Sequence, residues 1–337
     1  MWFALLSLLV IAIFFVVDTF IRTLRHPRFD GRSVLVTGCD SGFGEELAIA
    51  LSVKNIPTFA SCLTEQGMKN LRSKIGVRSA VSVFQMDICD QRSVDNGYNF
   101  VKKTLTDKEL WAVVNNAGVS GAEFYDDWMT VEDYKNVMEV NFFGTVRITQ
   151  SFKPLIKKSR GRFVFMTSVL GRVAVPMTGP YCASKFALEA YCDIIRRELS
   201  PWGVGIYILE PGFFCTALTD PRRKQHQWKQ RVKALDESIL DEYDENFITQ
   251  GYKGQEFLLE SFCCKNTSLV VEAYMNAITA RFPKYRCFIG LNSKIIMLPF
   301  AYFPSFISDL ATFVIYGFSF GRVKRKIDKQ IELNKRD

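Results

Sequence analysis

Histidine is scarce in this sequence. The 337 residues include only two, His26 directly after an apolar start and His226 within a charged stretch. A Ser-His-Asp triad or a histidine-rich metal site is therefore poorly supplied. The nine cysteines are scattered, and no two of them have the Cys-x-x-Cys spacing typical of redox or zinc motifs. We therefore expect a reducing compartment and no resident metal.

The middle of the chain also lacks a strong excess of positive charge. The net charge is +8, from 43 Lys and Arg against 35 Asp and Glu, but the excess gathers near the two ends. It comes from Arg22, Arg25, Arg28 and Arg32, and from the stretch GRVKRKIDK at 321–329. Basic residues placed in this way favour contact with membrane lipid over binding of nucleic acid.

The N-terminus is apolar from Trp2 to Val17, and to Ile21 if Asp18 lies at the headgroup boundary. About 20 helical residues cross a bilayer core of ~30 Å. A cleaved signal peptide is the alternative, but no basic region precedes the apolar stretch and no small-x-small site follows it. Residues 1–28 therefore predict an uncleaved membrane anchor with its basic flank. Because the arginines follow the apolar stretch, we expect the main domain on the cytosolic face.

From Ser33 onward, short apolar runs alternate with amphipathic stretches, which predicts βαβ units around a parallel sheet. The expected strands are SVLVTG (33–38), TFASCL (58–63), AVSVFQMD (80–87), WAVVNNAG (111–118), GRFVFMTS (161–168) and GVGIYILEPG (203–212). One doubly wound α/β sheet, a Rossmann fold, accounts for about residues 30 to 215. The main domain extends over 29–290.

Two further segments follow the predicted sheet. A charged stretch makes up most of a predicted substrate lid at about 213–262, which is too polar for a sheet core but periodic enough for surface helices. Residues 291–337 form an apolar helical extension with a basic tail, interrupted by Pro299, Pro304 and Asp309. We expect this extension to associate with a membrane, and a spanning helix and an interfacial or substrate-channel helix pair both remain open.

A glycine-rich loop follows the first predicted strand. It reads TGCDSGFG at 37–44, and the helix-like EELAIALS at 45–52 comes directly after it. Glycines allow a tight turn and a close approach to a pyrophosphate, and a helix N-terminus stabilises the phosphate charge. The position of the loop between strand and helix predicts dinucleotide binding.

Several motifs occur in the order found in one enzyme family. These are the glycine loop, Asp87, NNAG at 115–118, Asn141, Ser168, Tyr181, Lys185 and Pro211-Gly212. Over roughly residues 30 to 290 the sequence resembles a short-chain dehydrogenase/reductase. The stretches TGCDSGFG, CLTEQG, LWAVVNNAG and YCASKFALEA are similar to the membrane-bound retinol dehydrogenase and hydroxysteroid dehydrogenase branch.

The resemblance implies catalytic roles for four residues. Tyr181 would move a proton to or from the substrate oxygen, Ser168 would hydrogen-bond that oxygen, and Asn141 would support a water near Lys185. A phenol has a pKa of about 10, so operation near neutral pH needs roughly 4 kcal/mol of help from Lys185 and an oxidised nicotinamide in a partly dry site. The i, i+4 spacing lets Lys185 lie one helical turn from Tyr181. Substrate contacts are expected from Ser168 and Tyr181.

The resemblance also implies cofactor contacts, with Asp87 on the adenine and Thr216 on the nicotinamide carboxamide. Asp87 has an alternative role as the cap of the next helix. The full expected set is Gly38, Ser41, Gly42, Phe43, Gly44, Asp87, Asn115, Ala117, Gly118, Tyr181, Lys185, Pro211, Gly212 and Thr216.

The choice of dinucleotide depends on charges near the second predicted strand. NADP favours Arg or Lys there, and NAD favours Asp or Glu about 20 residues beyond the loop. Residues 61–64, which end and follow that strand, are Ser, Cys, Leu and Thr, so neither selector is evident, and Ser41 occupies a position that is often basic in NADP-dependent relatives. Without a phosphate clamp we expect NAD.

Aromatic residues near the end of the predicted sheet point to an apolar ligand. Phe213, Phe214, Trp228 and the aromatic tail are candidates to line a channel, although such side chains also build ordinary cores. We expect a hydrophobic alcohol and its ketone or aldehyde as substrates, such as a retinol or hydroxysteroid. The resemblance implies the endoplasmic reticulum membrane as location, and a homodimer is an open alternative to a monomer.

Three other functions were weighed for the same sequence. They are an NADPH-dependent lipid carbonyl reductase, a nucleotide-sugar epimerase, and a catalytically silent, membrane-tethered binding protein. The spacing of Gly38 and Gly42 disfavours the epimerase, and the complete Asn-Ser-Tyr-Lys set disfavours the silent protein. Asn266-Thr267-Ser268 is an N-glycosylation acceptor only if it faces the lumen, so glycan there would contradict the cytosolic orientation.

Overall fold

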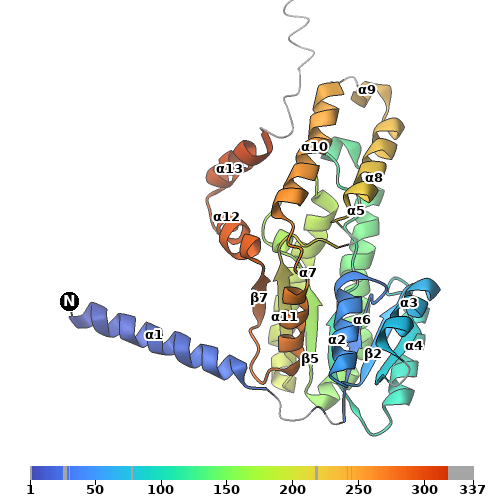
Figure 1. Cartoon of the computed structure of the whole chain (residues 1–337), viewed down its shortest axis with the longest axis vertical. Helices are drawn as coiled ribbons and strands as arrows, with labels where there is room; N and C mark the ends of the chain where they lie inside the picture. Colours follow the sequence, from blue (N-terminus) through green and yellow to red (C-terminus); the bar gives the residue numbers. More distant parts are fainter. Residues whose placement is uncertain are drawn as a thin grey trace, which may run out of the picture.

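The computed structural model of the chain describes residues 2–25, 29, 31–76, 79–216, 219–240, 242–243 and 245–317. Its centre is a seven-stranded parallel sheet with the order β3-β2-β1-β4-β5-β6-β7 (Figure 1). The strands are β1 (Arg32–Val36), β2 (Thr58–Cys62), β3 (Val81–Gln85), β4 (Glu109–Asn115), β5 (Arg162–Met166), β6 (Gly205–Pro211) and β7 (Arg286–Ile289). The strand order reverses between β1 and β4, which creates a crevice at the carboxyl ends of the strands.

Six of these strands match the sequence prediction, and β7 does not. It pairs with β6 in parallel, with Ile208 opposite Arg286 and Pro211 opposite Ile289. The sheet therefore continues far beyond residue 215, after the whole predicted lid has intervened. Only four residues long, β7 carries no alternating pattern long enough to be recognised from sequence.

Helices cover both faces of the sheet (Figure 1). Side chains of successive strand residues point to opposite faces, so Val34 and Val36 pack into one core and Leu35 into the other. The helices of the first face are α2 (Gly42–Val53), α3 (Glu65–Ile75) and α11 (Ser268–Thr279). Those of the second are α4 (Gln91–Leu105), α6 (Thr145–Ser159) and α7 (Gly179–Leu199).

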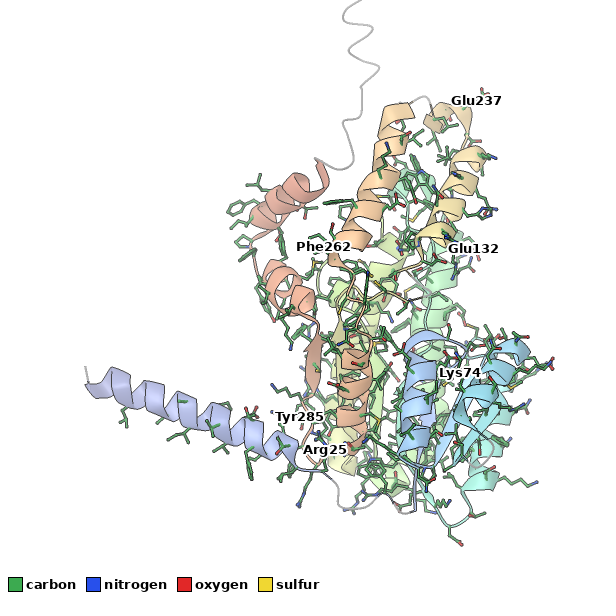
Figure 2. The ribbon with its side chains drawn as sticks, in the orientation of Figure 1. Arg25, Lys74, Glu132, Glu237, Phe262 and Tyr285 are labelled. Carbon is green, nitrogen blue, oxygen red and sulfur yellow. The ribbon has the colours of Figure 1, made fainter. Side chains whose placement is uncertain are left out.

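The first helix, α1 (Trp2–Thr23), extends away from the body of the domain (Figure 1). Arg25, which follows it (Figure 2), forms an isolated antiparallel β-bridge with Ala280. The Arg281 amide donates to the Leu24 carbonyl at 2.9 Å. The sequence predicts a spanning anchor here. Within the part of the chain that the structure describes, no helix is both long and apolar enough to cross a membrane.

The predicted lid folds into three helices above the carboxyl ends of the strands (Figure 1). They are α8 (Pro221–Ala234), α9 (Glu237–Leu240) and α10 (Glu245–Phe262). Asp220 caps α8 by accepting from the Arg222 amide at 3.1 Å, and Pro221 occupies its first turn. The apolar extension forms a π-helical turn (Asn292–Met297), α12 (Leu298–Phe300) and α13 (Ser305–Gly317). The basic stretch at 321–329 lies outside the described residues.

Candidate active site

A cavity of about 590 Å³ opens where the strands end. Its walls come from the segments that follow six parallel strands, from the loop before α7, and from the lid and C-terminal helices. Carboxyl ends of neighbouring parallel strands meet at one edge of a sheet, so residues far apart in the sequence converge here. The cavity is large enough for a small organic ligand.

The glycine loop forms one end of this cavity. Gly38 has a φ of +68°, and a Cβ there would lie 2.7 Å from the Ala117 Cα. A Cβ on Gly44 would lie 2.3 Å from the Gly38 carbonyl oxygen. Gly42 also has a positive φ, +62°, yet nothing lies within 4 Å of its Cβ position, so this backbone faces open space. The loop is therefore a tight cradle in which three positions carry no side chain.

The N-terminus of α2 belongs to the same loop and suits the binding of an anion. Ser41 is the N-cap residue, and its side chain makes no capping hydrogen bond. The first-turn amides of a helix need partners and carry partial positive charge. Ser41, Gly42 and Phe43 line the cavity. These features fit the pyrophosphate of a dinucleotide, which the backbone amides of this loop would hold.

Asp40, inside the glycine loop, is a cavity residue that sequence reasoning missed. Its carboxylate accepts hydrogen bonds from the Leu63 amide at 2.8 Å and from the Thr64 amide and hydroxyl at 2.9 and 2.8 Å. A Cβ on Gly67 would lie 2.3 Å from its Oδ1. Asp40, Leu63 and Thr64 all line the cavity. The fold thus brings a carboxylate to the end of β2, where residues 61–64 include no acidic side chain.

Asn115 and Asn116 are neighbours in the sequence, but their side chains have different roles. Asn115, predicted to contact the cofactor, is buried and donates to the Thr149 hydroxyl at 3.2 Å, and it is not among the cavity-lining residues. Asn116 lines the cavity and donates to the Thr37 and Gly38 carbonyls at 2.9 and 3.0 Å. Its oxygen accepts from the Tyr274 hydroxyl at 2.8 Å. Asn116 therefore fixes the shape of the glycine loop.

The remaining predicted cofactor residues divide into two groups. Those that line the cavity are Asp87, Ala117, Gly118, Tyr181, Lys185, Pro211, Gly212 and Thr216. Gly44 does not line it, because it packs beneath the loop. Asp87 is not the cap of α4, since Asp90 accepts from the Arg92 amide at 3.0 Å and fills that role. The Asp87 carboxylate accepts from the Cys89 amide at 2.8 Å.

Tyr181, Lys185 and Ser168 converge in the middle of the cavity. Pro180 at the start of α7 sets the first turn of this helix, and Tyr181 and Lys185 follow on the same face. The Ser168 hydroxyl, at the end of β5, hydrogen-bonds the Tyr181 phenol and also accepts from the Leu170 amide at 3.1 Å. The Lys185 ammonium donates to the Met166 carbonyl at 2.9 Å and lies 5.5 Å from the centre of the Tyr181 ring.

Burial dominates the electrostatics of these groups. It raises the pKa of the Tyr181 phenol, against the hydrogen bond with Ser168, which lowers it. Burial lowers the pKa of Lys185 from 10.5 to about 8, and the carboxylate of Glu189 acts in the opposite direction. Desolvation disfavours the charged form of both groups. The protein alone therefore keeps Tyr181 protonated, and additional positive charge in the cavity would be needed to favour its phenolate.

Asn141 lies behind this group, in a π-helical turn (Glu139–Gly144) between α5 (Val131–Met138) and α6. Its amide donates to the Val119 carbonyl at 2.9 Å and the Ser184 hydroxyl at 3.0 Å, and its oxygen accepts from the Val119 amide at 2.8 Å. A Cβ on Gly118 would be 3.1 Å from that oxygen. Asn141 is fully buried and joins the loop after β4 to α7. It does not line the cavity.

A buried ionic cluster extends from the back of α7 to β7. Arg286 bonds Glu189 and also contacts Glu210 at 3.0 Å and Asp193 at 2.7 Å. Arg172 joins Glu210 from the other side at 2.9 Å. Glu189 is one helical turn beyond Lys185, so the cluster positions the helix that carries the lysine. Sequence spacing gave no signal for it, because its members come from four separate elements.

Part of the cavity wall is apolar. Phe213, Phe214, Met297, Phe300 and Phe262 line it, the last at the end of α10 nearer the sheet (Figure 2). Residues of the C-terminal extension therefore contribute to the cavity wall. Trp228, predicted to line a channel, instead packs in an aromatic cluster outside the cavity.

Nucleophilic and metal chemistry find little support in this site. Burial raises the pKa of the Cys182 thiol, and its sulfur lies 3.0 Å from the Thr178 hydroxyl. A buried thiol of this kind is inert. In the part of the chain that the structure covers, no three His, Cys, Asp or Glu side chains form a group that could hold a metal ion. His226 is exposed and contacts Gln230.

Comparison with known proteins gives a consistent result. A family model described as short chain dehydrogenase matches residues 32–227. The chain is 36% identical over 303 residues to a 3beta-hydroxysteroid dehydrogenase of Caenorhabditis elegans, covering 88% of this chain and 78% of the relative. It is 35% identical over 288 residues to human retinol dehydrogenase 16, covering 86% and 89%.

Solved structures share the fold. A short chain dehydrogenase from Burkholderia cenocepacia, solved in complex with NADP, superposes with a TM-score of 0.61 and 21% identity. The match covers 82% of this chain and 96% of that one. At this identity the likeness concerns the sheet and its flanking helices.

Proposed function

Because the chain belongs to the short-chain dehydrogenase/reductase family, we propose that it is an NAD-dependent oxidoreductase of hydrophobic alcohols, reversible with the matching ketone or aldehyde. The observation that carries the proposal is the convergence of Ser168, Tyr181 and Lys185 in one cavity with the glycine cradle. A bound nicotinamide dinucleotide supplies the acceptor or donor of the hydride at this site.

The chain's own residues would handle the proton. The Tyr181 phenolate takes the hydroxyl proton of an alcohol and becomes the phenol, and in the reverse direction the phenol gives this proton to a carbonyl oxygen. Ser168 holds the same substrate oxygen by a hydrogen bond. Lys185 is buried beside the phenol and favours the phenolate whenever its ammonium is charged. Asn141 is a positioning residue, since its contacts with Val119 and Ser184 hold two walls of the site together.

NAD is the proposed dinucleotide because of Asp40. Its carboxylate lies between the glycine loop and the end of β2, bonded to the Leu63 and Thr64 amides. An additional phosphate near this carboxylate would suffer like-charge repulsion, whereas ribose hydroxyls could donate hydrogen bonds to it. An NADPH-dependent lipid carbonyl reductase is the second candidate on the same scaffold, and turnover with each dinucleotide separates the two.

We also propose a membrane-associated organisation for the chain. It comprises an anchor with its flank at 1–28, the dehydrogenase domain at 29–290 and a membrane-associated segment at 291–337. Leu6, Val10, Phe14 and Phe20 expose large apolar side chains on α1, which supports membrane contact. The proposed location is the endoplasmic reticulum with the domain facing the cytosol. Glycan on the exposed Asn266 would contradict this orientation.

The catalytic proposal is tested by Tyr181→Phe, assayed with NAD and NADP over retinoid, steroid and long-chain alcohols. Loss of the acid–base group should lower kcat by roughly 10² to 10⁴-fold, while the thermal stabilisation given by NAD stays nearly unchanged. Tyr191→Phe is the matched control, because Tyr191 lies on the same helix but not in the cavity. Full activity of Tyr181→Phe would contradict the role of the phenol. A wild type that binds NAD and oxidises none of these alcohols would contradict the whole proposal and favour a silent binding protein.

A further inference from the structure

A pair of opposite charges lies in the wall of the cavity. Glu123 follows β4, Lys224 belongs to α8, and their side chains form a direct ion pair. The Lys224 side chain is 9% exposed and that of Glu123 15% exposed. Both line the cavity, and neither belongs to the groups assigned above to proton transfer or to the cofactor. Burying two charges beside apolar walls is costly, so their location calls for a function.

The fold holds Lys224 firmly. Trp228 lies one turn further along the inward face of α8, with its ring centre 5.2 Å from Trp128 and 5.8 Å from Phe124. Arg231 continues this face and pairs with Asp133 at 2.7 Å. Phe124 directly follows Glu123, so both partners of the ion pair are tied to the same aromatic cluster. The ammonium is therefore fixed relative to the cavity wall.

Lys224 has hydrogen-bonding capacity left for a ligand. An ammonium carries three N–H donors. Within the described residues, the side-chain hydrogen bond of Lys224 is the one to Glu123. Arg223, which is exposed, lines the same cavity and adds a second positive charge. Together the two cationic side chains favour an oxygen that accepts hydrogen bonds, and Glu123 holds Lys224 in place.

The ion pair belongs to the same chamber as the reacting group. Burial is the main reason that the pKa of Tyr181 is raised, and the negative charge of Glu123 also contributes. The same cavity wall also contains hydrocarbon side chains, among them Val175, Met177 and Phe262. The cavity thus combines two polar sites, Tyr181 and the ion pair, with apolar surface.

We propose that Lys224, held in place by Glu123, is a specificity-determining residue that binds a second, hydrogen-bond-accepting oxygen on the substrate, remote from the carbon that reacts. The inference rests on the proposed dehydrogenase function and narrows its substrate class. It favours rigid alcohols that carry oxygen at both ends, such as oxygenated hydroxysteroids, over retinol, which has one. A substrate without the remote oxygen leaves the remaining N–H donors of this buried ammonium without an acceptor, which disfavours such a substrate.

The test compares matched substrates on the full-length enzyme. The first is a hydroxysteroid with a ketone at the end of the ring system opposite the reacting hydroxyl, and the second is the same steroid without that ketone. A third carries a carboxylate there, which distinguishes a neutral acceptor from an anion. We expect the wild type to show a kcat/KM at least tenfold higher with the remote oxygen. Lys224→Met should bring the ratio of the two values close to one.

Two further variants keep the test decisive. Arg231→Met alters the same face of α8 outside the cavity and should preserve the wild-type ratio. The double variant Glu123→Leu/Lys224→Met removes both charges together, so it avoids leaving one charge unpaired, and it should also bring the ratio close to one. Thermal unfolding with NAD checks that each variant is folded.

The outcomes separate the two proposals. A wild type that oxidises all steroids of the series equally well, or a Lys224→Met variant that keeps the preference, would overturn the role of Lys224 and leave the dehydrogenase proposal intact. A wild type that oxidises none of these alcohols, nor retinol, would overturn both.

Discussion

Tyr181 and Lys185 are four residues apart, and burial acts on them in opposite directions. The phenol keeps its proton more firmly than usual, and the ammonium loses its proton more easily, with a pKa of about 8. A site that holds a lysine in this state sacrifices stability for chemistry. The cost should be measurable in the protein without cofactor.

We predict that Lys185→Met stabilises the protein at pH 7. The unfolded chain binds a proton at Lys185 up to about pH 10.5 and the folded protein only up to about 8, so wild-type stability rises with pH across this window. The difference between the two pKa values corresponds to roughly 3 kcal/mol. We therefore expect Lys185→Met to raise the free energy of unfolding by about 1–3 kcal/mol. Denaturant unfolding at a series of pH values measures it.

The advantage of Lys185→Met should be complete below pH 8 and absent above pH 10.5. Lys135→Met is the control, because Lys135 is on the surface of α5 with 69% of its side chain exposed. A gain that does not depend on pH would show that packing and not charge is responsible.

Asp40 governs the choice of dinucleotide in our proposal. We predict that Asp40→Asn raises kcat/KM for NADP relative to NAD by about tenfold or more, since it removes a like charge from the neighbourhood of the additional phosphate. Steady-state kinetics with both dinucleotides measures the ratio. Glu65→Gln, a change of an exposed carboxylate in the same region, should leave the ratio unaltered. An unchanged ratio in Asp40→Asn would assign the carboxylate to loop structure alone.

The resemblance to short-chain dehydrogenases pointed to Tyr181, Lys185 and Ser168, and the structure brings these three side chains to one cavity. Their catalytic roles stay a prediction. Sequence analysis missed Asp40 because its carboxylate accepts a hydrogen bond from the Leu63 amide at the end of β2, 23 residues further along the chain. Its signal was Gly67, whose missing side chain makes room for the carboxylate. Asn115 and Asn116 could not be told apart, because only the backbone turn decides which side chain faces the cavity.

At the scale of elements, β7 is joined to the domain by both backbone pairing and charge. Arg286 reaches Glu189 and Asp193 on α7 and Glu210 on β6. Burial raises the pKa of the Glu210 carboxyl, and the nearby charge of Glu189 does so as well. Arg286 and Arg172 together therefore allow two carboxylates to be close together in the interior.

We predict that Arg286→Met lowers the free energy of unfolding by about 3 kcal/mol, because it removes one of the two arginines that compensate the buried carboxylates of Glu189 and Glu210. Urea unfolding measures the loss. Arg196→Met is matched to it, since Arg196 contacts Asp193 near the surface at 3.2 Å, and we expect a change below about 1 kcal/mol. Equal effects of the two substitutions would contradict a special role for the buried cluster.

The same element shows a limit of sequence reasoning. The strands β1 to β6 are apolar runs beside recognisable turns, and they were predicted. Strand β7 is four residues long, begins with a charged residue, and pairs with a strand about 80 positions away. Only the assembled sheet provides its partner. The lid helices were predicted as surface helices, but the inward placement of Lys224 and Trp228 depends on an aromatic cluster that periodicity does not reveal.

At the scale of the whole molecule, α1 projects from the domain (Figure 1). It carries large apolar side chains that are exposed. We predict that Phe14→Asp/Phe20→Asp lowers partitioning into phosphatidylcholine vesicles at least tenfold, since burial of one Phe contributes about 1.5–3 kcal/mol. Vesicle flotation of the full chain measures it. Val53→Asp changes an equally apolar side chain, 82% exposed on α2, and should leave flotation unaltered. If both variants float like the wild type, α1 is not the membrane contact.

The lid is an insertion whose two ends are fixed in the same sheet. It leaves β6 at Pro211 and the chain returns through α11 to β7, which lies directly beside β6 in register. The segment in between can therefore change in length and composition while the hydrogen-bond ladder on either side is kept. Replacing residues 213–262 by the corresponding segment of a relative should therefore change which ligands are accepted, while the proton-transfer residues stay the same. Evolution could diversify this enzyme by exchanging its lid.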